Sequence, residues 1–471
     1  VNQNFTDTYG FANDATLDGE GLLQPRLGIN WMASPELEVR GGIGLYSGGN
    51  PNVWLSNNYS NNGISLYQAS TPEDFFNADN TLFDIPHTGA GNPLIDIPQQ
   101  LFDEVSEAAG RGPVNALDPN FKLPKEWKYA LGATYTFDSG YVVMADVLYT
   151  KKEDAAIVSD LRRSEAGGFG AIGVLPDGRP LYPSIPRSVP EAFLLTNVNG
   201  DSGANLSASI SVSKSYDFGL DITAAYAYTD SEDVNPMTSS VAYSNYGNLA
   251  TADFENPGIA KSNYEIPHRF TLRATYKMEL LDGYDTTFSL FGSANEGRPY
   301  SFTMNGNGDI FTGRQLLYVP TGVDDPNFVA GSVTDRDTGV VTPFDTDGFF
   351  AFIQREGLSK YAGGYAPRNE FNSDWWVKVD FRFEQELPGF VEGHRSSVFF
   401  VIDNLTNLIN DDWGVLYETS FPRAVNVANF SATADNKYQF NSFNAGRVDP
   451  VQGRSGEPSL WSMRLGFEYK F

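Results

Sequence analysis

The stretch that most constrains the fold is the end of the chain, residues 461–471. Every odd position in it is apolar or aromatic, and every even position is polar or glycine. A strict period of two predicts a β-strand with one apolar and one polar face. A transmembrane barrel strand needs about 9–11 residues that are apolar outward and polar inward, with aromatic residues near the interfaces. The stretch therefore predicts a strand that crosses a membrane.

Ten further stretches alternate in the same way: 22–33, 37–46, 127–137, 141–150, 205–213, 220–228, 270–280, 287–294, 375–383 and 398–404. The connections between them are short and long in strict alternation. Outer-membrane barrels have short periplasmic turns and long outer loops, whereas a soluble sandwich has no reason to put every long loop at one end. The sequence predicts an all-β fold, a transmembrane antiparallel β-barrel with about 11 strands here.

Composition agrees with this class and excludes others. Aromatic residues make up 14% of the 471 residues, which suits the aromatic girdles of a barrel. No apolar run approaches the roughly 18 residues of a membrane helix. The net charge of −27 is opposite to what nucleic-acid binding requires, so nucleic acid is not an expected partner. The chain has no cysteine, which suits a periplasm or cell surface.

Several short segments, in order over almost the whole chain, resemble a TonB-dependent outer-membrane receptor of the Oar-like branch. They lie at residues 24–28, 40–42, 44–46, 50–54, 267–270, 317–320, 366–369, 380–383, 403–407 and 413–414, before the closing strand. The resemblance implies a barrel of about 22 strands with an N-terminal plug. It also implies active uptake of a scarce ligand with energy from the inner membrane. The implied partners are the lipid bilayer, TonB and its inner-membrane complex, the receptor's own plug domain and the outer-membrane assembly machinery. No cofactor is implied.

Eleven strands are about half of such a barrel. Counting back from a periplasmic C-terminus, the strand at 22–33 descends from the outside, so residues 1–21 are expected to be the tail of an outer loop. A barrel protein cannot begin there, and open sheet edges are costly in lipid. We therefore expect residues 1–471 to be the C-terminal part of a receptor barrel, with the plug, its energy-coupling box and the N-terminal strands not present.

The closing strand also resembles the C-terminal signal by which outer-membrane barrels are recognised for assembly. The residues expected to carry this signal are Trp461, Leu465, Phe467, Tyr469 and Phe471.

If the apolar positions face lipid, a set of arginines faces the lumen: Arg26, Arg40, Arg269, Arg273, Arg382 and Arg464. Carboxylates such as Asp146, Asp380 and Asp403 are expected on the same face. These groups suit either cross-strand ion pairs on the water-exposed inner face of the barrel or a docking surface for a plug.

The long segments are rich in aromatic residues and amides, which suit capture of a glycan or a peptide. The candidate ligand-contacting residues are Trp54, Tyr59, Tyr243, Tyr246 and Trp413. The same residues also suit ordinary exposed loops, and whether the ligand is a siderophore, a peptide or a glycan cannot be read from the sequence.

Other candidate chemistry is sparse. The histidines are His87, His268 and His394, and the strand order puts His394 on the opposite side of the membrane from the other two. No nucleophile–base set or zinc motif is readable, so no enzymatic activity is predicted. The run at residues 305–309 alternates Asn or Asp with Gly but lacks the distal Glu of a calcium loop, which favours a flexible turn. The barrel pattern alone also allows a passive porin or a surface adhesin.

Overall fold

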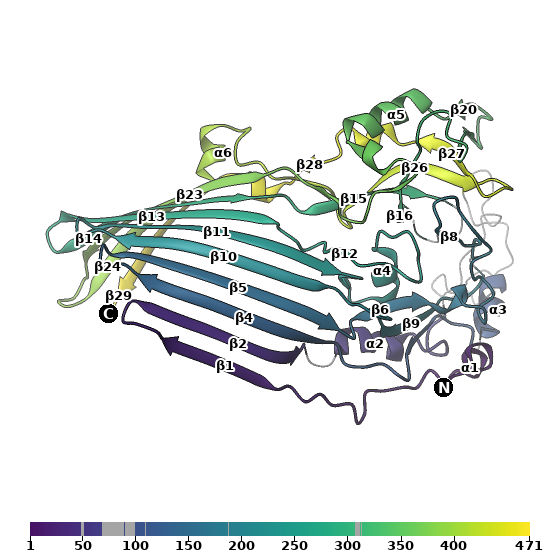
Figure 1. Ribbon diagram of the computed structural model, residues 1–471, viewed down its shortest axis with the longest axis horizontal. Helices are drawn as coiled ribbons and strands as arrows, with labels where there is room; N and C mark the ends of the chain where they lie inside the picture. The colour runs from purple at the N-terminus through teal and green to yellow at the C-terminus, as the bar shows by residue number, and fades with distance from the viewer. Residues whose placement is uncertain are drawn as a thin grey trace.

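The computed structural model describes residues 1–48, 51–67, 89, 99–108, 110–186, 188–306, 311 and 313–471. Its main element is a twelve-stranded antiparallel sheet (Figure 1). Eleven of its strands follow each other in sequence order and are here called the wall, and the two-residue β12 (Ala260–Lys261) pairs with the end of β11. The wall strands are β1 (Arg26–Met32), β2 (Leu37–Ser47), β4 (Lys125–Thr136), β5 (Tyr141–Glu153), β10 (Ala204–Ser215), β11 (Leu220–Asp233), β13 (His268–Leu281), β14 (Tyr284–Asn295), β23 (Trp376–Pro388), β24 (Arg395–Asp403) and β29 (Ser462–Lys470). The eleven alternating stretches of the sequence are therefore confirmed as strands, with ends that shift by a few residues.

The register of the wall separates a polar face from an apolar face. Residues that pair across neighbouring strands point to the same side of a sheet. One such row is polar or small: Asn30, Arg40, Gly132, Asp146, Ser209, Ala227, Arg269 and Asn295. The adjacent row is apolar and aromatic: Trp31, Val39, Ala133, Ala145, Ile210, Tyr226, Phe270, Ala294 and Val377. The alternation predicted from single strands thus holds across the sheet.

The connections of the wall alternate in length as the sequence predicts. The short turns are 33–36, 137–140, 216–219, 282–283 and 389–394, and the long connections are 48–124, 154–203, 234–267, 296–375 and 404–461. In Figure 1 the short turns and the C-terminus lie at the left end of the wall, and the N-terminus lies at the opposite end among the long connections. Residues 1–25 therefore lie at the end of the wall where a tail of an outer loop is expected.

The described wall is open. β1 pairs with β2 alone and β29 pairs with β24 alone, so the first and last strands do not hydrogen-bond to each other. Every residue of β1 is exposed, and most residues of β29 are exposed as well. The two edges therefore offer unpaired backbone groups to further strands.

The long connections are not the irregular loops that their sequence suggests. Their described residues and residues 1–25 form a second body, here called the loop layer, which contains its own sheets. A six-stranded sheet joins β16 (Gln315–Leu316), β15 (Pro299–Asn305), β26 (Ala424–Ala432), β27 (Tyr438–Phe443) and β18 (Phe328–Ala330), with β22 (Phe371–Asn372) beside β15. A three-stranded sheet joins β3 (Val114–Leu117), β9 (Ala192–Asn197) and β6 (Ala156–Asp160). The sequence analysis identifies these segments only as long loops, and the structure shows the sheets within them.

The remaining elements of the loop layer are short. Its paired two- and three-residue strands are β7 (Gly173–Val174), β8 (Pro180–Leu181), β12 (Ala260–Lys261), β17 (Tyr318–Val319), β19 (Ser332–Thr334), β20 (Val341–Pro343), β21 (Gly364–Tyr365), β25 (Tyr417–Glu418) and β28 (Gly453–Arg454). Its helices are α1 (Gln3–Tyr9), α2 (Asn52–Ser60), α3 (Gln99–Ser106), η2 (Leu161–Arg163), α4 (Ala242–Gly247), α5 (Thr346–Arg355), η3 (Leu358–Tyr361), α6 (Leu405–Ile409), α7 (Ala445–Val448) and η4 (Glu457–Ser459). No helix in the described part of the chain is long and apolar enough to cross a membrane.

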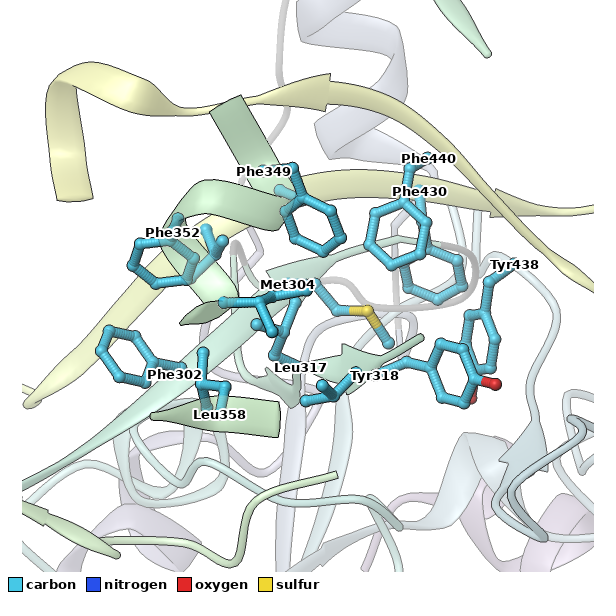
Figure 2. Close-up of a cluster of buried hydrophobic side chains, with 14 of the residues drawn as sticks. Phe302, Met304, Leu317, Tyr318, Phe349, Phe352, Leu358, Phe430, Tyr438 and Phe440 are labelled. Atoms are coloured by element: carbon cyan, nitrogen blue, oxygen red, sulfur yellow. The ribbon is translucent and has the colours of Figure 1, made fainter. Parts of the chain in front are cut away.

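The hydrophobic core lies in the loop layer rather than in the wall. Figure 2 shows its largest cluster, in which Phe302, Met304, Phe349 and Phe440 meet between β15, α5 and β27. Tyr318 and Tyr438 stack in the same cluster, with 4.2 Å between their ring centroids. The loop layer is thus held by ordinary apolar burial, whereas the wall exposes large apolar side chains along one face.

Replacing Leu131 by arginine tests the assignment of the faces. Leu131 lies in β4 on the apolar face and is 63% exposed, so the variant puts a charge where lipid is expected. We expect a cost of about 2–4 kcal/mol and a loss of protein inserted in the outer membrane. The fraction with heat-modifiable mobility on a gel measures insertion.

Ala130→Arg is the matched control, because Ala130 is exposed on the polar face one position away. The residue on the other side, Gly132, is unsuitable, since a Cβ there would lie 2.2 Å from Asp146 Oδ1. Equal loss of insertion in the two variants would show that the faces are wrongly assigned.

Candidate functional site

The polar face of the wall carries the six arginines that the sequence singles out. Register places Arg26, Arg40, Arg269, Arg273, Arg382 and Arg464 on one face. They come from five strands, with two of them on β13. No local sequence pattern connects them, except that each occupies a polar position in the alternation of its own strand. That this face lines a lumen or meets a plug stays a prediction.

Three of these arginines are held by carboxylates of the wall. Arg40 lies 2.6 Å from Asp146 and donates to Thr134, Arg382 lies 2.7 Å from Glu384, and Arg464 lies 3.0 Å from Asp403. These pairs are partly exposed, so each contributes little, about 0–1 kcal/mol. They fit the first interpretation of the sequence, cross-strand ion pairs on a water-exposed face.

The other three arginines have no carboxylate partner among the described residues. Arg26 donates to Gln24 and lies over the ring of Tyr46. Arg269 and Arg273 are exposed, lie four residues apart on β13 and form no ion pair with any described residue. These two exposed cations on the polar face are available to an acidic partner. This fits the second interpretation of the sequence, in which the polar face is a docking surface for a plug.

The predicted assembly residues lie at the last strand and its end. Leu465 is 77% exposed and Phe471 is 98% exposed, and Trp461 and Phe467 are exposed as well. Tyr469 differs from them, because its hydroxyl lies 2.8 Å from His394 Nδ1 and its ring stacks on Phe390. It fastens the last strand to the short turn 389–394, a contact that sequence reasoning missed. Whether these residues form an assembly signal stays a prediction.

The five aromatic ligand candidates differ in accessibility. Tyr59 and Trp413 are well exposed, and Tyr243 is partly covered by Phe311. Trp54 is half-buried and donates to the Ser239 carbonyl. The structure corrects the prediction for Tyr246, which is 2% exposed and packs in a core cluster, so its side chain is not open to a ligand.

Tyr246 instead belongs to a buried polar cluster at the base of the loop layer. Its hydroxyl donates to Glu255 at 2.7 Å, and the backbone N–H of Asp160 donates to the same carboxylate. Arg314 donates to the Tyr246 carbonyl and lies 4.1 Å from the Tyr246 ring centroid. Burial, and then the nearby Asp160 carboxylate, raise the pKa of Glu255 to about 7. Nothing in the sequence pattern distinguishes Glu255 from exposed glutamates.

Glu255→Gln should stabilise the loop layer above neutral pH. The pKa of Glu255 lies near 7 in the fold and near 4.5 when unfolded, so the folded state holds the extra proton between these values. Stability therefore falls as pH rises from about 4.5 to about 7 and then levels off. The neutral amide should remove this slope and add about 3 kcal/mol at pH 8. Proteolysis of the loops in urea at pH 5 and pH 8 measures it. A wild-type loop layer that is equally stable at both pH values would contradict the assignment.

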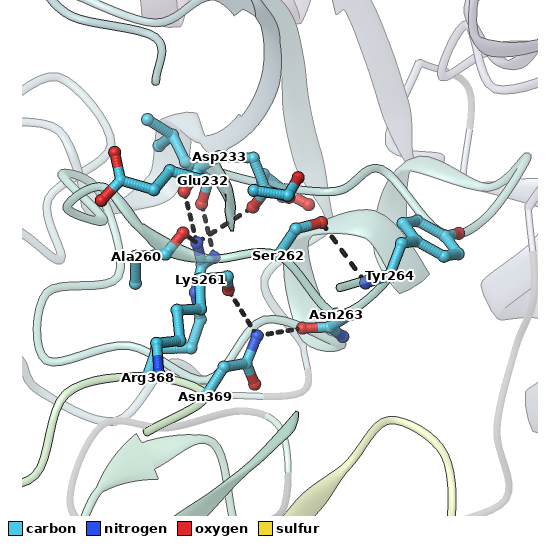
Figure 3. Close-up of polar contacts among 12 residues, drawn as sticks. Glu232, Asp233, Ala260, Lys261, Ser262, Asn263, Tyr264, Arg368 and Asn369 are labelled. Atoms are coloured by element: carbon cyan, nitrogen blue, oxygen red, sulfur yellow. Dashed lines mark hydrogen bonds and ion pairs between the residues drawn. The ribbon is translucent and has the colours of Figure 1, made fainter. Parts of the chain in front are cut away.

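A second buried group fastens two long connections to each other. Figure 3 shows Arg368 reaching from the connection 296–375 to the end of β11, where it lies 3.0 Å from Asp233 Oδ1. Its guanidinium also donates to the carbonyls of Asp233, Val234 and Ala260. Asn369, in left-handed conformation with φ 59°, donates to Lys261 O and Asn263 Oδ1. The segment 366–369, part of the family resemblance, thus has a structural role.

The remaining sequence candidates carry no site. His268 lies at the first residue of β13, at the loop end, and His394 lies in a short turn at the other end, as predicted. His87 and most of the 305–309 run lie outside the described residues. Among the described residues no group of three or more His, Cys, Asp or Glu is arranged to hold a metal ion.

The family of the chain follows from its comparison with known proteins. Residues 5–412 match the family model described as an outer membrane beta barrel domain. The chain therefore belongs to the outer membrane β-barrel family, and its place is the bacterial outer membrane. Barrel strands of this class turn their apolar side outward, so contact with lipid is the expectation for the apolar face of the wall.

The chain is also similar to larger solved barrels. These include the outer membrane transporter YddB from Escherichia coli, with 10% identity and a TM-score of 0.40, covering 95% of this chain and 40% of that one. The FrpB iron transporter from Neisseria meningitidis has 9% identity and a TM-score of 0.38, covering 96% and 39%. BauA, the ferric preacinetobactin receptor from Acinetobacter baumannii, has 11% identity and a TM-score of 0.35, covering 96% and 37%. The chain spans about two fifths of the length of these proteins. No curated protein matches it.

Proposed function

We propose that this chain is part of the wall of an outer-membrane transporter that takes up a scarce ligand with energy from the inner membrane, as TonB-dependent receptors do. The observation that carries the proposal is the eleven-stranded open wall with two unpaired edges. Unsatisfied backbone groups cost several kcal/mol each in lipid, so further strands are needed to complete the barrel. Barrels of about 22 strands are typical of transporters that contain a plug. Without a plug, the lumen of so wide a barrel would be an open pore.

The polar face supports a plug as the inner partner. Arg269 and Arg273 are exposed there without a described carboxylate partner, and an acidic plug surface would supply one. In this proposal the plug and the segment that contacts TonB precede residue 1 in the full receptor, and the long connections capture the ligand outside.

Dependence of uptake on the proton gradient tests the proposal. A strain lacking the full-length gene is screened on defined limiting nutrients, and uptake of the affected nutrient is then measured with and without a protonophore. The proposal expects uptake to collapse when the gradient is dissipated. Uptake that persists without the gradient would indicate a passive porin, and a strain with unchanged uptake but lost surface attachment would indicate an adhesin.

A further inference from the structure

The apolar face of the wall carries an isolated cation at the end where the short turns lie, here called the turn end. Lys214 lies one residue before the end of β10, next to the turn 216–219, and register places it beside Tyr141 on the apolar face. The other Lys, Arg, Asp and Glu side chains that the described wall strands place on this face lie at the opposite, loop end: Lys125, Lys151, Glu153, Asp230 and Glu232. Lys214 forms no ion pair with any described residue, so its charge has no balancing partner among them.

Two tyrosine rings lie against the Lys214 ammonium group. Its Nζ atom is 4.3 Å from the ring centroid of Tyr141 and 4.8 Å from that of Tyr216. Tyrosines of membrane proteins gather at the level of the lipid headgroups, where a lysine on the lipid face costs far less than at the centre of the bilayer. Contacts with aromatic rings hold a cation in place but do not neutralise it. An anion at the headgroup level would therefore complete this arrangement.

An apolar groove of about 420 Å³ begins beside this cation. It includes Val212, the next residue of β10 on the apolar face, about 7 Å along the strand from Lys214. The groove continues across β11, β13 and β14 to β23, over the small residues Ala224, Gly292 and Ala294. The side chains that line it from the apolar face are otherwise large and apolar, among them Ile210 and Phe270. A cation at the headgroup level followed by an apolar groove matches the layout of a phospholipid, in which a charged headgroup is followed by hydrocarbon.

We propose that Lys214 and this groove bind one anionic phospholipid. The phosphate pairs with Lys214, the hydroxyl groups of Tyr141 and Tyr216 donate to its oxygens, and an acyl chain lies in the groove. A headgroup with a net negative charge, as in phosphatidylglycerol, fits a single cation, whereas a zwitterionic headgroup would bring a second cation to it. Asp138 and Asp217 lie in the neighbouring turns, but neither forms an ion pair with Lys214. This inference requires lipid on the apolar face of the wall but does not depend on active transport.

A photocrosslinker beside Lys214 tests the proposal in the full-length receptor. Benzoylphenylalanine replaces Val143, which pairs with Val212 on the apolar face, and the receptor is placed in nanodiscs of equal phosphatidylglycerol and phosphatidylethanolamine. Phe400 is the reference position for the same crosslinker, because it lies on the apolar face in β24, beyond the far side of the groove. We expect the ratio of phosphatidylglycerol to phosphatidylethanolamine adducts, measured by mass spectrometry, to be about fivefold higher at position 143 than at position 400.

Substitutions of two lysines show whether Lys214 causes this preference. Lys214→Met should lower the adduct ratio at position 143 to that at position 400, and Lys214→Arg should keep most of the preference. Lys277→Met is the matched control and should leave the ratio unchanged, because Lys277 lies at the turn end of β13 on the polar face, where it pairs with Asp285. Equal ratios at the two positions in the wild type, a preference for phosphatidylethanolamine, or an equal effect of Lys277→Met would overturn the proposal.

Filling the groove tests the contact with the acyl chain. A Cβ at Gly292 would meet nothing closer than 3.9 Å, so Gly292→Leu places a larger side chain in the groove without displacing the wall. Heat-modifiable mobility should show normal insertion of this variant. The fraction of receptor that keeps a phosphatidylglycerol molecule through detergent exchange, measured by native mass spectrometry, should fall about tenfold in it and in Lys214→Met. Retention at the wild-type level in either inserted variant would contradict a lipid bound at both places.

Discussion

Changing the closing strand at three positions should leave the protein unfolded in the periplasm. The variant combines Phe467→Ser and Tyr469→Ser with deletion of Phe471. Phe467 and Phe471 are exposed and add little to packing within the described structure. Removing these two side chains should therefore not by itself destabilise the fold. If the aromatic C-terminal strand is read by the assembly machinery, insertion should fall below about a tenth of the wild-type level. Heat-modifiable mobility in outer-membrane fractions measures it.

A second hairpin gives a matched control for this result. Tyr135, Phe137 and Tyr141 are three exposed aromatic residues around the short turn between β4 and β5, at the same end of the wall. Replacing all three by Ser removes a similar aromatic surface without touching the closing strand, and assembly should continue. Normal mobility of the closing-strand variant, or equal failure of the control, would refute a dedicated signal at residues 461–471.

Arg368→Met should detach the long connections from each other while the wall stays folded. The variant removes a buried cation and leaves Asp233, which is 7% exposed, as an unpaired charge, together with three carbonyls that lose their donor. Breaking a buried ion pair from one side costs about 3–5 kcal/mol. Limited proteolysis should therefore cut within residues 234–267 and 296–375, whereas heat-modifiable mobility should be unchanged.

Two further variants locate the cause. Arg368→Met combined with Asp233→Leu removes both charges and should recover part of the protection, since replacing both partners costs less than orphaning one. Arg336→Met removes an exposed arginine between β19 and β20 that forms no ion pair with any described residue, so it should change little. Equal protection in wild type and Arg368→Met would show that this contact does not hold the loop layer.

The wall could be predicted because the membrane imposes a pattern on each strand separately. Lipid outside and water inside require apolar and polar residues to alternate within every strand. The pairing of consecutive strands then follows from the short turns that connect them. The ends were less precise: β23 was expected over 375–383 but extends to Pro388, because paired strands continue beyond the strongly apolar stretch.

The loop layer could not be predicted by the same reasoning, because its strands are short and several of them pair with partners far away in the sequence. β15 does alternate, with Tyr300, Phe302 and Met304 between polar residues, but it is buried at six consecutive positions and is shorter than the about 9–11 residues of a membrane strand. Its parallel partner β26 lies more than a hundred residues further along the chain, and no local signal announces that pairing. The burial of Tyr246 also has no local signal in the sequence. It arises from Phe193, Phe311 and Arg314, which lie far from Tyr246 in sequence.

Spin-label accessibility along β4 tests most directly that this sheet is the wall of an outer-membrane barrel. Residues 1–471 contain no cysteine, so single cysteines can be placed at positions 128–131, 133 and 134 of the full-length receptor in bilayers, with any cysteine elsewhere in that receptor first replaced by serine. Collision with oxygen should be high at Tyr129, Leu131 and Ala133, which share the apolar face, and collision with a water-soluble nickel complex should be high at Lys128, Ala130 and Thr134. Equal accessibility at odd and even positions, or nickel access at all six, would contradict a wall with lipid on one face and an aqueous lumen on the other.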